Sequence, residues 1–129
     1  MTDKLIDEIR NSLDSGEITS DVLFDEAISN AYKYQNDYNC FVTILDNNRF
    51  VSGNSVISGI PYALKDNIST KGILTTGSSN ILKDYIPLYD ATVYKKLKEA
   101  GAVLMGKTVL DELAMGGTGT TGHTGIVRN

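Results

Sequence analysis

The sequence predicts an α/β fold with parallel strands, incomplete within this chain. The main observation is a helix expected over residues 90–100 that leads directly into an apolar strand over 102–105, an order typical of parallel strands under helices. A second short apolar strand is expected over 60–64, and both strands are predicted to be buried on both faces. The chain has 129 residues, of which 41% are hydrophobic and 22% charged, so it can form a core within one domain at most.

Residues 1–40 are predicted to be helical and residues 41–129 to form the α/β part of the same domain, with no complete second domain. A first helix that ends at Gly16 is predicted from apolar residues at spacings of three and four, namely Leu5, Ile6, Ile9 and Leu13. Thr19 or Ser20 can cap a second helix. The face of that helix that we expect to be buried comprises Val22, Leu23, Ala27, Ala31 and Tyr34.

The remaining elements follow from local signals. The β-branched run Phe41–Leu45 predicts the first strand of the sheet. Asp90 can cap the helix that precedes the strand over 102–105, and Gly101 can end it. Thr108 is expected to cap a short final helix, with Asp111 three residues later as in a capping box.

Eleven of the twelve glycines follow residue 50, and two glycine motifs among them match nucleotide-binding patterns. Residues 101–108 fit G-x-x-x-x-G-K-T, but the intervening residues form the apolar strand, which favours a helix-to-strand turn over a phosphate-binding loop. Residues 117–122 fit G-x-G-x-x-G but follow a predicted helix, which favours a flexible pocket wall over a dinucleotide site. Because a domain rarely ends in such an open loop, we expect the chain to be the front part of a larger protein.

Composition and charge exclude several classes of protein. No run of 18 apolar residues is present, which excludes a membrane span, and the first ten residues lack the apolar stretch of a signal peptide. Cys40 is the only cysteine, so we expect neither an internal disulfide nor a cysteine metal cage, and a reducing cytoplasm fits. Residues 1–60 carry ten acids and four bases, a balance of −6, whereas residues 61–129 carry six and eight, a balance of +2. This asymmetry favours a solvated acidic helical face and argues against a nucleic-acid-binding arm.

Lys65 is the side chain with the clearest capacity for catalysis. It follows the apolar strand over 60–64, where we expect its ammonium to be partly desolvated. A lysine that can lose its proton near neutral pH can serve as a general base. The ordinary alternative is a surface lysine that forms an ion pair with Asp66.

Four segments resemble, in order and spacing, the motifs of the amidase signature family. They are GIPYALKDNI at 59–68, TTGSS at 75–79, DATV through EAGAV at 90–103, and GKTVLDELAMG at 106–116. The last segment, together with SGEITS at 15–20, resembles the A-subunit branch of the glutamyl-tRNA(Gln)/aspartyl-tRNA(Asn) amidotransferases. The resemblance covers essentially the whole chain, and it implies the N-terminal part of the family fold, a mixed β-sheet covered by helices.

The resemblance also implies a catalytic triad of serine, cis-serine and lysine, in which Lys65 is the general base. In the family the two serines lie in segments of the form G-G-S-S-G-G-S and G-S-D-T-G-G-S, and neither segment occurs in this chain. We therefore expect the chain to be inactive on its own.

The family's pocket residues can be carried over in the same way. The resemblance implies no metal site, and it places along the amide-substrate pocket Met115, Gly116 and Gly117. Ser78 and Ser79 correspond to a structural turn, and His123 falls in a loop, so none of the three is expected to be catalytic. Residues 118–123 depart from the loop usual in the family, and Gly77-Ser78 stands where the family usually has Ala-Gly. Both departures leave the selectivity for the amide substrate open.

The function that the resemblance implies is the supply of ammonia from L-glutamine in translation. The ammonia would convert Glu-tRNA(Gln) to Gln-tRNA(Gln), or Asp-tRNA(Asn) to Asn-tRNA(Asn), within a cytoplasmic heterotrimer that also contains the amidotransferase subunits B and C. ATP, Mg²⁺ and the misacylated tRNA would bind through the B subunit, so no cofactor and no membrane contact are expected for this chain. Two alternatives are a free-standing amidase of the same family and a non-catalytic, truncated gene product.

Overall fold

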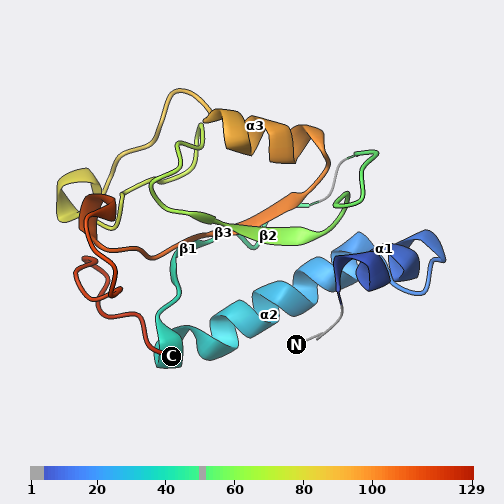
Figure 1. Cartoon of the computed structure of the whole chain (residues 1–129), viewed down its shortest axis with the longest axis horizontal. Helices are drawn as coiled ribbons and strands as arrows, with labels where there is room; N and C mark the ends of the chain where they lie inside the picture. Colours follow the sequence, from blue (N-terminus) through green and yellow to red (C-terminus); the bar gives the residue numbers. More distant parts are fainter. Residues whose placement is uncertain (1–4, 50–51) are drawn as a thin grey trace.

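The computed structural model describes residues 5–49 and 52–129, which form three layers (Figure 1). Within these residues the helices are α1 (Ile6–Asp14), α2 (Ser20–Tyr38) and α3 (Thr92–Glu99), and the strands are β1 (Phe41–Ile44), β2 (Pro61–Lys65) and β3 (Val103–Thr108). Two short 3-10 turns are η1 (Asn80–Leu82) and η2 (Glu112–Ala114). The α2 helix lies along one face of the sheet and α3 lies on the opposite side (Figure 1). The predicted α/β fold is confirmed.

The sheet is mixed and has the order β1-β3-β2. β3 pairs in parallel with β2 and antiparallel with β1, so the parallel pairing predicted from the sequence is confirmed for β2 and β3. The prediction that both strands are buried on both faces is wrong for β2. Leu64 is buried, whereas Ala63 and Lys65, which point to the other side of this edge strand, are exposed. β3 is mostly buried because it is the central strand.

The two N-terminal helices begin and end close to where the sequence places them. Gly16 follows α1 with φ +74°, a left-handed conformation that glycine adopts without strain. The Thr19 side chain accepts a hydrogen bond from the Val22 amide at 3.3 Å and so caps α2.

The predicted buried face of α2 is only partly correct. Leu23 and Ala31 are buried as expected, but Val22 is 56% exposed. Phe24, 1% exposed, and Ile28 lie on the same helix face as Ala31 and form a core cluster with Val103. The large ring of Phe24 therefore decides which face of α2 is buried, and Val22 and Tyr34 turn towards solvent.

Two caps predicted for the second half are also corrected. α3 begins at Thr92, and Asp90 instead accepts a hydrogen bond from the Lys71 amide at 2.6 Å, which ties the preceding loop to the start of the helix. Thr108 does not cap a helix, because pairing with strands on both sides extends β3 to this residue. Only the 3-10 turn at Glu112–Ala114 follows, with Leu113 in a left-handed conformation at φ 52°.

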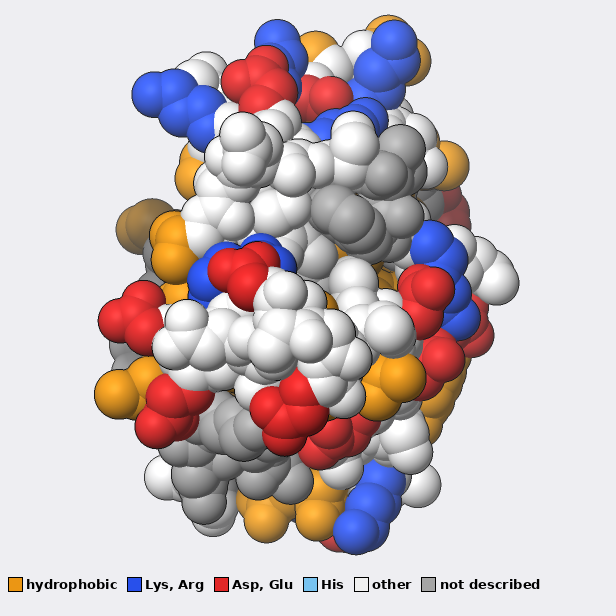
Figure 2. All heavy atoms as spheres, turned by 90° about the vertical axis from the view of Figure 1, so that its right-hand side faces the viewer, with side chains coloured by type: hydrophobic (Ala, Val, Ile, Leu, Met, Phe, Trp, Pro, Cys, Tyr) orange, Lys and Arg blue, Asp and Glu red, His pale blue; other side chains and the backbone are white. Residues whose placement is uncertain are grey.

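The charge asymmetry of the sequence is visible on the surface. Figure 2 shows acidic side chains gathered over α1 and the beginning of α2, whereas the lysine side chains of α3 stand at the top, beside acidic ones. The acidic helical face predicted for the N-terminal third is therefore solvated. Among the described helices, none has the length and apolar character needed to cross a membrane.

Candidate active site

Lys65 is the last residue of β2, at the point where the strand gives way to a turn. Its carbonyl oxygen accepts a hydrogen bond from the Ile68 amide at 3.0 Å, and the next amide, of Asp66, donates to the Thr108 carbonyl at 3.1 Å. The side chain of Lys65 is exposed, and no carboxylate of residues 5–49 and 52–129 lies within ion-pair distance of its ammonium.

Neither environment predicted for Lys65 from the neighbouring residues is therefore present. The expected desolvation is missing because side chains alternate along a strand, so that Leu64 enters the core and Lys65 points away from it. The alternative ion pair with Asp66 is also wrong, because the Asp66 carboxylate lies inside the molecule and faces Lys107.

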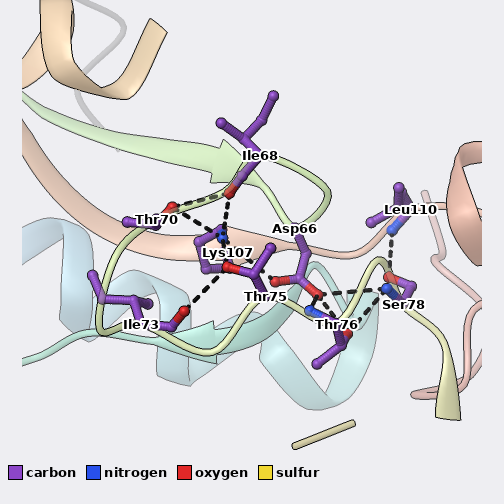
Figure 3. Close-up of polar contacts among 9 residues, drawn as sticks. All are labelled: Asp66, Ile68, Thr70, Ile73, Thr75, Thr76, Ser78, Lys107 and Leu110. Carbon is purple, nitrogen blue, oxygen red and sulfur yellow. Dashed lines mark hydrogen bonds and ion pairs between the residues drawn. The ribbon is translucent and has the colours of Figure 1, made fainter. Parts of the chain in front are cut away.

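Asp66 and Lys107 form a buried ion pair next to the turn at residues 65–68, called the Lys65 turn below (Figure 3). Both side chains are fully buried, and 3.7 Å separates the Lys107 Nζ from the Asp66 Oδ1. The ammonium donates hydrogen bonds to the Ile68 carbonyl at 2.9 Å, the Thr70 Oγ1 at 3.2 Å and the Thr75 Oγ1 at 2.7 Å. Burial lowers the pKa of Lys107, and the neighbouring Asp66 carboxylate opposes part of that shift.

The other oxygen of the Asp66 carboxylate holds the turn at residues 76–78. Asp66 Oδ2 accepts hydrogen bonds from the amide and the hydroxyl of Thr76, at 2.9 and 2.5 Å, and lies 3.5 Å from the Ser78 amide. The Ser78 hydroxyl in turn accepts a hydrogen bond from the Leu110 amide at 3.0 Å (Figure 3). One buried carboxylate therefore links the end of β2 to the segment that follows β3.

The lysine of the first glycine motif is this same Lys107. It lies within β3, its side chain is surrounded by protein oxygens, and the apolar residues of the motif form the strand. The interpretation of residues 101–108 as a helix-to-strand connection is confirmed, with Gly101 at φ +83° after α3.

The second glycine motif folds around the carboxylate of Asp111. Four successive amides and one hydroxyl donate to it at 2.8 to 3.1 Å: those of Thr118, Gly119, Thr120 and Thr121, and the Thr121 hydroxyl. A Cβ at Gly116 would lie 2.6 Å from the Asp111 Cγ, so only glycine allows this approach. The Asp111 carboxylate therefore fixes the shape of the loop at residues 117–122, and no helix follows the motif within residues 123–129 as it would in a dinucleotide site.

The predicted pocket residues lie beside this loop and are exposed: Met115, Gly116 and Gly117. The turn at residues 77–79 links the Lys65 turn to Leu113, which precedes these pocket residues in the chain. On one side the Gly77 amide donates to the Asp66 carbonyl at 3.1 Å; on the other, the Gly77 carbonyl accepts from the Leu113 amide at 2.8 Å. The Ser79 hydroxyl donates to Glu112 at 2.7 Å, which agrees with the structural role predicted for this turn.

Lys107 and Asp111 are the two organising residues that sequence reasoning missed. Lys107 lies inside a motif that resembles a phosphate-binding loop, and the sequence pattern places Asp111 in a helix cap. A lysine within an otherwise apolar strand was the available signal, because a charge placed there needs a buried partner.

Asp111→Asn is expected to destabilise the protein and to flatten the dependence of its stability on pH. Hydrogen bonds from the 118–121 backbone lower the pKa of the Asp111 carboxyl, so its contribution is present above the unfolded pKa of about 4 and lost as the pH falls below it. Urea unfolding between about pH 6 and about pH 3 measures the effect. Asp84→Asn, at an exposed aspartate, is the matched control. The same pH slope in wild type and Asp111→Asn would contradict the assignment.

Comparison with known proteins gives a consistent result. The sequence profile of the amidase family matches residues 20–129. The A subunit of the glutamyl-tRNA(Gln) amidotransferase of Streptococcus pneumoniae (strain 70585) is 42% identical over 136 residues, which cover 98% of this chain and 28% of that protein. The chain therefore spans little more than a quarter of the length of this relative.

Solved structures show the same architecture. The crystal structure of the glutamyl-tRNA(Gln) amidotransferase A subunit from Thermotoga maritima superposes with a TM-score of 0.79 at 36% identity, covering 85% of this chain and 24% of that one. The 6-aminohexanoate cyclic dimer hydrolase superposes with a TM-score of 0.87 at 24% identity, covering 98% and 27%, which shows a shared fold alone.

Proposed function

Since this chain belongs to the amidase family, we propose that it is the N-terminal part of a glutamine-hydrolysing subunit of a tRNA-dependent amidotransferase. The similarity to A subunits of glutamyl-tRNA(Gln) amidotransferases over 98% of the chain supports this assignment. The observation that carries it is the place of Lys65 at the end of β2, on a turn held by hydrogen bonds. Its side chain is exposed, and no carboxylate in the described part of the chain lies within ion-pair distance of it.

In the proposed reaction Lys65 is the general base of a serine, cis-serine and lysine triad. The neutral amine would accept the proton of the relay serine, which in turn takes the proton of the attacking serine. The attacking serine would form a glutamyl ester with the side-chain carbonyl of glutamine, while the Lys65 ammonium returns its proton through the relay serine to the leaving nitrogen. Ammonia would then leave, and water would hydrolyse the ester to glutamate. Both serines would come from sequence outside this chain, and the same sequence would cover Lys65 and desolvate its amine.

The pocket for the amide would include the exposed edge formed by Met115, Gly116 and Gly117. The carboxylate of Asp111 fixes the loop beside them through four backbone amides, so the wall of the proposed pocket would be formed before substrate binds. Ammonia would then pass to the B subunit, which would use ATP and Mg²⁺ to transfer it to misacylated tRNA, with the C subunit completing a cytoplasmic heterotrimer.

A free-standing amidase of the same family is the second candidate. The observation that favours it is the departure of residues 118–123 from the loop usual in the family, because this loop adjoins the proposed pocket. The two candidates share Lys65 and differ in the amide that they hydrolyse.

The experiment is to purify the full-length protein with the B and C subunits and to measure the release of glutamate and ammonia from glutamine, with and without misacylated tRNA. Glutamine hydrolysis by the complex supports the proposal. Hydrolysis of other amides but not of glutamine supports the free-standing amidase. A folded full-length protein that hydrolyses neither would overturn both and leave a non-catalytic role.

A further inference from the structure

We propose that the buried Asp66–Lys107 ion pair is a positioning device that fixes the turn carrying Lys65, and so sets the direction in which the Lys65 amine points. This inference rests on the proposed function, because it assigns the pair a role in glutamine hydrolysis.

The first argument is the cost of the pair. Both charges are fully buried, and 3.7 Å between Nζ and Oδ1 is too long for a direct hydrogen bond. Asp66 Oδ1 has no hydrogen-bond donor among the described residues. Replacing a buried ion pair by apolar side chains is often neutral or stabilising. Stability alone therefore does not explain the pair, and its contacts point to a second role.

The second argument is where the ammonium donates its protons. Lys107 Nζ donates to the carbonyl of Ile68 at 2.9 Å, and the amide of Ile68 donates to the carbonyl of Lys65 at 3.0 Å. The ammonium thus holds the residue that closes the Lys65 turn. Its two other hydrogen bonds, to the hydroxyls of Thr70 and Thr75, fix the segment that follows (Figure 3).

The third argument is the alternation of side chains. Asp66 follows Lys65 directly, and its carboxylate points inwards while Lys65 points outwards. The backbone of Asp66 is held on both sides, because its amide donates to Thr108 and its carbonyl accepts from Gly77. Rotation of the turn would move the Lys65 side chain and break the ion pair together. A displacement of about 1 Å in a catalytic group can cost about a hundredfold in rate.

The test compares variants of the full-length protein in its complex. Lys107→Met removes the charge and the three donors, whereas Lys95→Met, at an exposed lysine of α3, is the matched control. We expect Lys107→Met to lower kcat for glutamine by about a hundredfold with KM changed less than about threefold, because the loop beside the proposed pocket keeps its own hydrogen bonds to Asp111. Lys95→Met is expected to keep wild-type values. Circular dichroism and melting curves identify the variants that are folded.

A second readout does not depend on turnover. Competitive labelling with acetic anhydride, quantified by mass spectrometry, compares the reactivity of Lys65 with that of the exposed Lys83. Loss of the pair is expected to change this ratio by about threefold or more, because the turn beneath Lys65 is no longer fixed. If the wild type does not hydrolyse glutamine, the proposed function fails, while the labelling ratio still decides the positioning role.

The milder variant Thr75→Val keeps the ion pair and removes one acceptor of the ammonium. This variant tests the inference if Lys107→Met does not fold. We expect Thr75→Val to lower kcat several-fold and to change the labelling ratio of Lys65 to Lys83. A folded Lys107→Met, or a folded Thr75→Val in its place, with wild-type kcat and wild-type labelling of Lys65 would overturn the inference.

Discussion

Lys65→Arg is expected to reduce glutamine hydrolysis by the full-length protein by roughly a thousandfold or more, in a protein that remains folded and bound to its partner subunits. The proposed role requires a nitrogen that can be neutral near pH 7, and a guanidinium stays protonated. The Asp66–Lys107 pair does not involve Lys65, so the substitution leaves the buried contacts of the turn in place. Release of glutamate from glutamine is the measurement.

Two controls separate the chemical role of Lys65 from a structural one. Lys71→Arg, at an exposed lysine of the neighbouring loop, is expected to retain wild-type activity. Transamidation with added ammonia is expected to survive in Lys65→Arg, because the transfer step would take place on the B subunit. Glutamine hydrolysis by Lys65→Arg within a few-fold of wild type would show that Lys65 is not the base.

The isolated 129-residue chain is expected to hydrolyse glutamine about a millionfold more slowly than the full-length protein, if at all. Neither serine segment of the family occurs in its sequence, and loss of an activated nucleophile removes most of the rate enhancement. A sensitive ammonia assay on the purified chain, beside its Lys65→Ala variant, measures this. Turnover that disappears in Lys65→Ala would contradict the prediction, since a contaminating amidase would not respond to that substitution.

The secondary structure could be predicted from the sequence wherever the signal was local. Apolar spacing and single capping residues located α1, α2 and the three strands, and of the two candidate caps of α2, Thr19 and Ser20, Thr19 is the one that caps the helix. The buried face of α2 was partly wrong because it depends on contact between Phe24 and Val103, which lie far apart in the sequence. The end of β3 was wrong for the same reason, since its last residues are held by pairing with two other strands.

In the candidate site, too, the features set by local sequence were predictable and those set by long-range contacts were not. The position of Lys65 at the end of a strand was predictable, but its exposure was not, because that depends on which side of β2 faces the core. The partner of Asp66 was also beyond local reasoning. Leu64 lies opposite Lys107 in the parallel register of β2 and β3, and this register brings Lys107 close to Asp66. A nearest-neighbour argument assigned Asp66 to Lys65 instead.

The strand order β1-β3-β2 has a consequence for synthesis on the ribosome. The central strand is the last of the three to be translated, so β1 and β2 leave the ribosome before either has its partner. The α1 and α2 helices depend largely on local contacts and can form early, whereas the sheet can form only after β3, which ends at Thr108, has been translated. During this interval two unpaired strands are open to misassembly. A pause in translation just before β3 is therefore expected to increase the demand for chaperones more than a pause after it.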